Sequence, residues 1–309
     1  METIVQKETI ITKDGGLRKL PFDTERLVKY MEAQGVDDKD IAHKVIRAIT
    51  AKEAFPASEI PSLLIRTVLE EMDEASPHWT FVASRIYATV LYKKAGVNRR
   101  SSKETKYGDF AELVETLVTK GIYHPDLLSK YSKEELEKAG KLIDPERDKL
   151  LTYPAIRTLS TRYLATGKDE SVYELPQERW LVIALWLMQD EDKSKRLEYV
   201  EQAYWALSNL LMTVATPTLA NSGKLHGQLS SCFIDTVEDS LQSIYDSNTD
   251  IATLSKWGGG IGVYVGKIRA RGSSIRGHKG ASSGTVPWIK QLNNTAVSVD
   301  QLGEMYAPI

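Results

Sequence analysis

The chain has 309 residues, with 40 lysines and arginines against 42 aspartates and glutamates, so its formal net charge is only −2. A nearly neutral chain has no overall field to attract nucleic acid or an anionic membrane, and we expect neither partner. No apolar run approaches the ~20 residues of a membrane-spanning helix. The one cysteine, Cys232, excludes an intrachain disulfide framework and a cysteine-rich zinc site. We expect a cytoplasmic protein of two or three domains.

Residues 5–20 predict a β-hairpin, because Asp14-Gly15-Gly16 suits a tight turn with positive φ angles. Asp23 or Thr24 should cap a first helix, and a third helix should start near Ser58. A fourth helix should end at the basic pair before Gly96. The apolar positions of the four helices are Leu27, Val28 and Met31; Ile41, Val45 and Ile49; Leu64, Val68 and Met72; and Trp79, Val82, Ile86 and Val90. Residues 1–97 therefore predict a hairpin capped by four helices.

A polar segment without periodicity, 98–109, indicates a domain boundary. Residues 110–221 have helical periodicity, and their most apolar run, 180–188, predicts buried core because it is too short to span a bilayer. Residues 237–257 predict one long helix, and 260–272 predict a strand entering a loop. Leu241, Ile244, Ile251 and Leu254 should form the apolar side of that helix. The expected fold class is α+β, with domains at 1–97, 98–221 and 222–309.

Basic residues cluster around the predicted hairpin and the end of the fourth helix. Cations gathered there can hold a triphosphate, since charge-assisted contacts to phosphate oxygens are strong. A solvated basic face is the alternative that composition alone leaves open. The residues concerned are Lys13, Arg18, Lys19, Arg26, Lys93 and Lys94.

The segments ITKDGGLRKLPFDTERL and WTFVASRIYATVLYKKA resemble the ATP-cone, a regulatory domain that binds ATP or dATP in many ribonucleotide reductases. The order of the predicted elements agrees with that domain. A threonine often found before its third helix is absent here, where Ala57 precedes Ser58. The resemblance implies nucleotide contacts at Lys13, Lys19, Arg26 and Lys93.

Cys232 follows two serines, and its chemistry alone indicates a buried structural residue more readily than a reactive thiol. However, TPTLANSG followed by QLSSCF resembles the large subunit of ribonucleotide reductase. That resemblance implies that Cys232 is one half of a redox pair that reduces the substrate and becomes a disulfide. It also implies substrate contacts at Thr216 and Ser231. The partner thiol must lie outside these 309 residues, since they contain no second cysteine.

An acidic residue near a helix start, followed by two arginines, suits a nucleoside triphosphate. Simple helix capping by Asp239 is the alternative. The family resemblance implies the specificity site, where a bound effector selects the substrate, and a homodimer through the helix of residues 240–257. The three glycines after that helix do not form a Walker-type phosphate loop, because no GK[ST] follows. The implied effector residues are Asp239, Ser240, Leu241, Arg269, Ile275 and Arg276.

The five histidines lack ligand spacing, so we expect no metal site in this chain. The family resemblance runs to about Gly303, and the sequence then reads GEMYAPI. We expect 222–309 to open a ten-stranded α/β barrel whose radical-bearing cysteine and second redox cysteine lie elsewhere. This chain alone should then be inactive, whether it is one piece of a split subunit or a truncated remnant.

The implied activity is the reduction of ribonucleoside diphosphates to deoxyribonucleoside diphosphates, under ATP and dATP control. The implied partners are the rest of the large subunit, a radical-generating small subunit with a metal centre, and thioredoxin or glutaredoxin. A diiron or dimanganese partner is expected, with a cobalamin-dependent system as the alternative. A nucleotide-binding regulatory protein without catalysis stays open. A repressor carrying an ATP-cone is excluded, because its zinc ribbon needs four cysteines and the chain has one.

Overall fold

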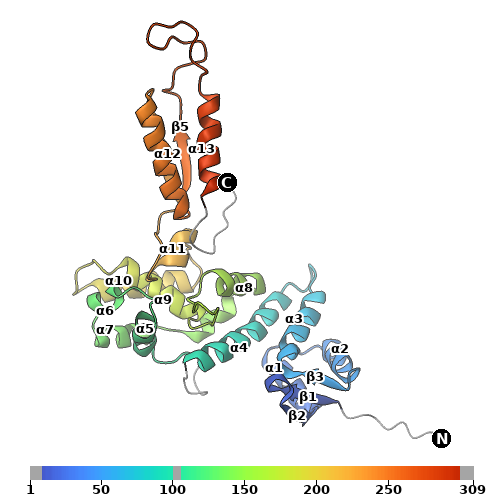
Figure 1. The fold of residues 1–309 in the computed structure, drawn as a ribbon. Coiled ribbons are helices and arrows are strands. Elements are labelled where there is room, and N and C mark those ends of the chain that lie inside the picture. The colour runs from blue at the N-terminus through green and yellow to red at the C-terminus, as the bar shows by residue number, and fades with distance from the viewer. Residues whose placement is uncertain (1–8, 100–105, 300–309) are drawn as a thin grey trace, which may run out of the picture.

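The computed structural model describes residues 9–99 and 106–299 as three groups of elements (Figure 1). The first group comprises β1 (Ile10–Lys13), β2 (Arg18–Pro21), α1 (Thr24–Ala33), α2 (Lys39–Thr50), β3 (Ala54–Pro56), α3 (Ile60–Glu70) and α4 (Trp79–Arg99). The helical group comprises α5 (Phe110–Thr119), α6 (Asp126–Lys130), α7 (Lys133–Gly140), α8 (Tyr153–Arg162), α9 (Pro176–Leu187), α10 (Arg196–Ser208) and α11 (Thr216–Asn221). The third group comprises β4 (Cys232–Thr236), α12 (Leu241–Lys256), β5 (Gly260–Tyr264) and α13 (Val286–Ser298). This mixture of helices and small sheets confirms the α+β class.

The predicted hairpin forms from β1 and β2, which pair antiparallel around a turn with φ angles of 51° at Asp14 and 66° at Gly15. The hairpin prediction began at residue 5, and residues 5–8 lie outside the described residues. Strand β3 was not predicted from the sequence, and it pairs parallel with β1. Three residues are too few to show strand alternation. Phe55 of β3 is nevertheless buried opposite Ile11, so the first sheet has the order β2-β1-β3.

The four helices of the first group form largely where the periodicity places them. Asp23 caps α1 by accepting a hydrogen bond from the Arg26 backbone N at 2.9 Å. Two details of the third helix were wrong: α3 starts at Ile60 rather than near Ser58, and Met72 lies beyond its end and is exposed. A short 3₁₀ turn occupies 57–59 instead, so the chain enters the helix two residues later than expected.

The predicted end of the fourth helix before Gly96 was also wrong, because α4 continues to Arg99. Buried contacts on both sides offset the cost of a glycine inside a helix. Ala95 is fully buried, Asn98 donates to the Val172 carbonyl at 2.7 Å, and Arg99 pairs with Glu178. Polar residues 98 and 99 are therefore structural, while 100–105, the centre of the predicted boundary, lie outside the described residues.

Helix α4 contributes to two hydrophobic cores. The core of the first group includes α4 residues up to Ile86, and the core of the helical group begins with Ala88. Residues 176–185 of α9 are all buried, which confirms the buried-core prediction for 180–188 as far as Leu185, whereas Leu187 is 42% exposed. No described helix is long and apolar enough to cross a membrane. The division at 97/98 and 221/222 stays a prediction.

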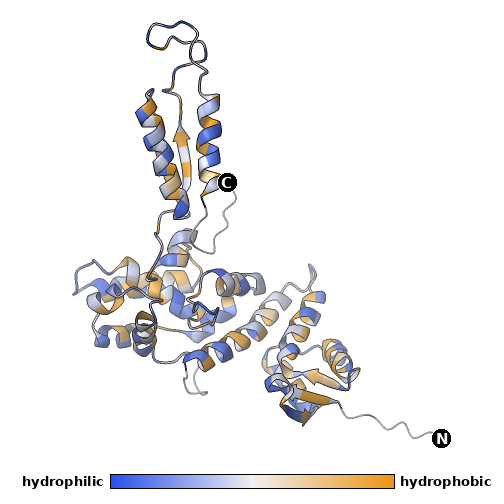
Figure 2. Ribbon diagram, in the orientation of Figure 1, coloured by the Kyte–Doolittle hydropathy of each residue, from blue (hydrophilic) through white to orange (hydrophobic). Residues whose placement is uncertain are grey.

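The third group is a parallel β4–α12–β5 unit followed by α13, and α12, β5 and α13 are labelled in Figure 1. Helices α12 and α13 pack side by side and bury one side each, in keeping with the alternation of hydrophobic and hydrophilic residues along them (Figure 2). Phe233, Ile261 and Val263 are partly buried, whereas Ile234 and Tyr264 are exposed, at 89% and 57%. One face of the two-stranded sheet is therefore covered and the other is open.

The prediction of one helix over 237–257 was wrong at its start. The backbone N of Val237 donates to the Tyr264 carbonyl at 3.0 Å, which extends the strand pairing, and α12 begins only at Leu241. Ser240 is the N-cap and accepts from the Ser243 backbone N at 3.1 Å. Leu241, expected on the apolar side, is 66% exposed, while Ile244 and Ile251 are buried as predicted.

Candidate functional site

The two halves of the TPTLANSG–QLSSCF segment fold against each other. Thr218 Oγ1 donates to the Leu229 carbonyl at 3.0 Å, and Asn221 Nδ2 donates to the Gln228 carbonyl at 2.9 Å. Gly227 has a φ angle of 115°, and a Cβ there would lie 2.4 Å from the Asn221 side chain. Helix α11 is thus held against the residues that lead to Cys232.

Cys232 is the first residue of β4, and its thiol is free and exposed. The Ser231 hydroxyl lies 3.4 Å from its sulfur, and the Ser231 carbonyl accepts from the Gly260 backbone N at 2.9 Å. The structure therefore places Cys232 on the open face of the sheet, with the hydroxyl of Ser231 beside its sulfur. Thr216 is exposed in the first turn of α11. The alternative of a buried structural cysteine was wrong.

A buried arginine that was not predicted from the sequence anchors the end of α11. Arg179 and Glu174 are both fully buried, with 3.4 Å between Nη1 and Oε1, and Arg179 Nη2 donates to the Ser222 carbonyl. Tyr123 Oη donates to Glu174 at 2.5 Å, and the Ala165 backbone N donates at 2.6 Å. The sequence signal was a charged stretch, ELPQER, directly before the most apolar run of the chain. Charges in such a place are retained only when paired.

The chain after α11 is also fixed by backbone contacts. The backbone N of His124 donates to the Gly223 carbonyl at 2.9 Å, and the backbone N of Leu225 donates to the Ile122 carbonyl at 3.0 Å. Gly223 has a φ angle of 69°, and a Cβ there would lie 2.6 Å from Val182 of α9. Only glycine fits this close approach without strain.

Two of the predicted effector residues form a direct pair. Arg269 Nε donates to Asp239 Oδ2 at 2.8 Å and Oδ1 at 3.0 Å, and the Arg269 backbone N donates to Oδ1 at 3.2 Å. Both side chains are 36% exposed. Helix capping by Asp239 was the wrong alternative, since Ser240 is the N-cap. The carboxylate therefore fixes the start of the loop after β5.

The remaining effector residues lie near this pair. Arg269 Nη1 donates to the Ser274 carbonyl at 2.9 Å, so the guanidinium also holds the next turn. In that turn Ile275 pairs with His278, and Arg276 has a φ angle of 47°. Arg276 is exposed, and Leu241 is exposed in the first turn of α12.

The cations of the first group are brought together only in part. The pKa of the exposed Asp14 carboxyl is lowered, mainly because Arg18 donates a hydrogen bond to it. The positive charges of Arg18, Lys13 and Lys93 lower it further. Lys93 of α4 therefore acts electrostatically on the hairpin turn. Lys19 lies on β2 and Arg26 in the first turn of α1, and neither side chain forms an ion pair with a described residue.

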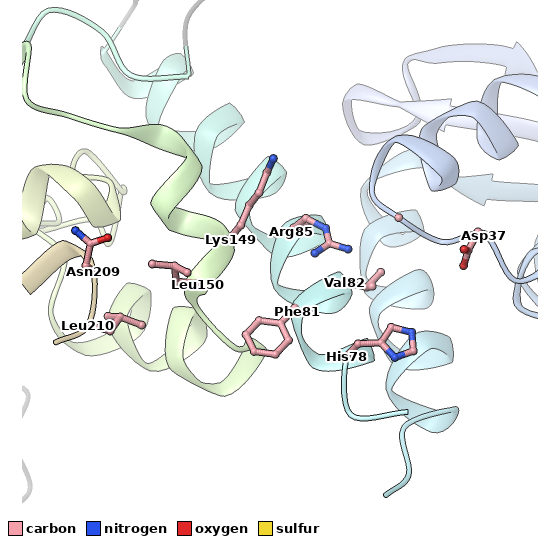
Figure 3. A pocket seen from close by; sticks show the side chains of 10 residues that line it. Asp37, His78, Phe81, Val82, Arg85, Lys149, Leu150, Asn209 and Leu210 are labelled. Carbon is pink, nitrogen blue, oxygen red and sulfur yellow. The ribbon is translucent and has the colours of Figure 1, made fainter. Parts of the chain in front are cut away.

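Metal ligands and a cleft between two groups of elements are the remaining candidates for parts of a site. Across residues 9–99 and 106–299, no group of three histidine, cysteine, aspartate or glutamate side chains is arranged to hold a metal. A cleft of about 560 Å³ lies between the first group and the helical group (Figure 3). Its walls include Arg85, His78 and Leu210 but none of the predicted site residues, so we assign it no part in the reaction.

Comparison with known families agrees with this arrangement. Residues 149–227 match the all-alpha domain of ribonucleotide reductase, and residues 230–305 match its barrel domain. The two matches meet between α11 and Cys232, the segment whose halves fold together. The fold and the site thus define a protein that joins these two reductase domains.

Individual relatives extend the match over most of the chain. It is 40% identical to ribonucleoside-diphosphate reductase subunit alpha of Treponema pallidum over 82% of this chain and 29% of the relative. The subunit alpha of Helicobacter pylori is 35% identical over 96% of this chain and 36% of the relative, and that of Synechocystis is 36% identical over 95% and 37%. The chain belongs to the ribonucleotide reductase large-subunit family, and it spans about a third of the length of these relatives.

Proposed function

We propose that this chain supplies the allosteric part and one half of the substrate-reducing dithiol of a ribonucleoside-diphosphate reductase. The observation that carries the proposal is the exposed thiol of Cys232, held at the start of β4 by a segment tied to α11 and α9. A thiol that must reach both a substrate and a second thiol has to be accessible and firmly placed.

Cys232 would donate electrons as one member of a dithiol. Oxidation of two thiols to a disulfide releases two electrons and two protons, and the 2′-hydroxyl of the ribose leaves as water. The second thiol and the radical that activates the ribose belong to the rest of the large subunit and to a radical-generating small subunit with a metal centre. Thioredoxin or glutaredoxin would then reduce the disulfide. Thr216 and Ser231 would hold the substrate by hydrogen bonds.

The first group would act as the ATP-cone, binding ATP or dATP. Its hairpin and four helices support this assignment, as does the influence of Lys93 on the hairpin turn. Lys13, Lys19 and Arg26 would contact the same nucleotide. The β4–α12–β5 unit would open the ten-stranded barrel, with its exposed sheet face turned to the barrel interior.

The specificity effector would bind at Asp239, Ser240, Leu241, Arg269, Ile275 and Arg276. The pairing of Asp239 with Arg269 and the tie from Arg269 to the next turn support one common site. A homodimer would form through α12, whose outer side leaves Leu241 and Tyr245 exposed.

A single turnover without external reductant tests the dithiol assignment. The chain is assembled with a polypeptide that supplies the rest of the large subunit and with the radical-generating subunit, reduced beforehand, and given a ribonucleoside diphosphate. We expect the Cys232 peptide to change from alkylatable to disulfide-linked in proportion to the deoxynucleotide formed. A Cys232 that stays fully alkylatable after product forms would overturn the assignment.

A further inference from the structure

A groove of about 880 Å³ lies where the helical group meets the end of α12, and the proposed function does not use it. Its walls come from the segment after α5, the end of α8 with the following loop, the segment after α11, and the end of α12. The residues that characterise it are Lys120, Arg162, Lys168, Tyr173, Lys224 and Trp257.

The groove is strongly cationic in a chain whose net charge is −2. Four of its side chains are lysine or arginine, and Asp169 is the acidic residue among those lining it. The Ser171 hydroxyl and backbone N hydrogen-bond Asp169 at 2.5 and 3.2 Å and, with the nearby charge of Lys120, lower the pKa of its carboxyl, so this anion offsets one of the four positive charges. Arg162 and Lys168 form no ion pair with any residue in the described part of the chain. Their charges are therefore available to an anion.

The walls of the groove are tied together rather than loosely apposed. Lys224 Nζ donates to the Leu164 carbonyl at 3.3 Å, which joins the segment after α11 to the end of α8. A β-bridge pairs Tyr123 with Lys224, and a second bridge closes the loop between Thr166 and Val172. A groove whose walls are already fixed loses little entropy when it binds a ligand.

Aromatic rings lie beside the cations. Lys120 Nζ is 5.2 Å from the ring centroid of Tyr173. Trp257, which also lines the groove, is 43% exposed, and Lys256 Nζ lies 5.8 Å from its ring centroid. A ring flanked by cations offers a planar surface next to phosphate-binding charge, a combination that suits nucleotide-like anions.

We propose that this groove binds an oligophosphate, either free or as the phosphate chain of a nucleotide, through Lys120, Arg162 and Lys168. The site is distinct from the proposed ATP-cone and specificity residues, since the lining includes none of them. Charge-assisted contacts from several cations favour a ligand with several phosphate oxygens over a single carboxylate.

The test is acetylation footprinting of the full chain, with inorganic tripolyphosphate as the probe. We expect tripolyphosphate to slow modification of Lys120 and Lys168 by about fivefold or more, since bound phosphate occupies their ammonium groups. Lys133 and Lys138 on α7 are exposed and lie outside the groove, so they serve as internal controls. ATP should protect at least as well, and stronger protection by ATP would show that the base contributes.

Variants decide whether the protection is specific. Arg162→Ala with Lys168→Ala should raise the tripolyphosphate concentration that half-protects Lys120 by about tenfold. The charge-retaining Arg162→Lys with Lys168→Arg should keep it, which separates lost binding from lost folding. The matched pair Lys133→Ala with Lys138→Ala removes the same charge elsewhere. It should change the tripolyphosphate concentration that half-protects Lys120 by less than about twofold. Equal losses in both alanine pairs, equal protection by polyglutamate, or no protection of Lys120 and Lys168 would overturn the proposal. None of these outcomes depends on the dithiol assignment of Cys232.

Discussion

The buried pair of Arg179 and Glu174 allows a sharp test of how the Cys232 segment is positioned. Replacing Arg179 by Met removes the positive charge beside a fully buried carboxylate and the donor to the Ser222 carbonyl. The carboxylate keeps Tyr123 and Ala165 as donors but loses its counterion. Breaking a buried pair by removing one partner costs about 3–5 kcal/mol.

That loss is a large part of the total stability of a folded protein, which is about 5–15 kcal/mol. The exposed pair of Lys130 and Asp190, whose side chains are 43% and 77% exposed, is the matched control. Lys130→Met should cost less than about 1 kcal/mol, because solvent screens such a pair. Glu174→Gln in the Arg179→Met background should recover part of the loss, since it neutralises the orphaned charge.

Urea unfolding of the three variants and the parent chain measures these differences. We also expect faster hydrogen exchange at the Leu225 amide in Arg179→Met, because Ser222 is then released from α9. An Arg179→Met chain that loses no more free energy of unfolding than Lys130→Met would refute the anchoring role of this arginine.

Three other predictions concern the effector residues and one buried acid. Lys93→Ala should weaken ATP or dATP binding by about tenfold in calorimetry while Lys39→Ala does not, and equal affinity in both would remove Lys93 from the nucleotide site. Replacing Arg269 and Arg276 together by Ala should abolish effector-dependent substrate choice in the assembled enzyme and leave part of the basal turnover, and unchanged choice would refute the specificity site. Burial raises the pKa of Asp148 above its ordinary value of 3.8, so its contribution to stability is fully present below pH 3.8 and is lost as the pH rises through the raised pKa. Asp148→Asn should therefore flatten the fall in the free energy of unfolding as the pH rises from 3.8 through the raised pKa of Asp148. A slope as steep as that of the parent chain over this pH range would contradict the prediction.

The helical periodicity predicted the cores well because apolar spacing is a local signal. Ile41, Val45 and Ile49 are fully buried on α2, and the apolar run of α9 lies inside the second core. The errors lie where tertiary contacts override local pattern. β3 is too short to recognise, and α4 passes through Gly96 because Asn98 and Arg99 are bonded to the 172–178 segment.

The site was predictable as a set of residues but not as a geometry. The sequence placed Ser231 beside Cys232 by adjacency alone, whereas the pairing of Asp239 with Arg269 joins residues 30 positions apart. Arg179 was missed because a charged residue beside an apolar run gives no sign of its partner, and Glu174, Tyr123 and Ser222 come from three separate segments.

The central claim is that Cys232 supplies electrons to the substrate, and the most direct measurement is deoxynucleotide formation by the assembled enzyme with Cys232→Ser. The chain is combined with the rest of the large subunit, the radical-generating subunit and thioredoxin, and product is measured over many turnovers. We predict loss of turnover in Cys232→Ser with unchanged effector binding, whereas Ser230→Ala, an exposed neighbour, retains activity. Turnover by Cys232→Ser at the rate of the parent chain would contradict the account.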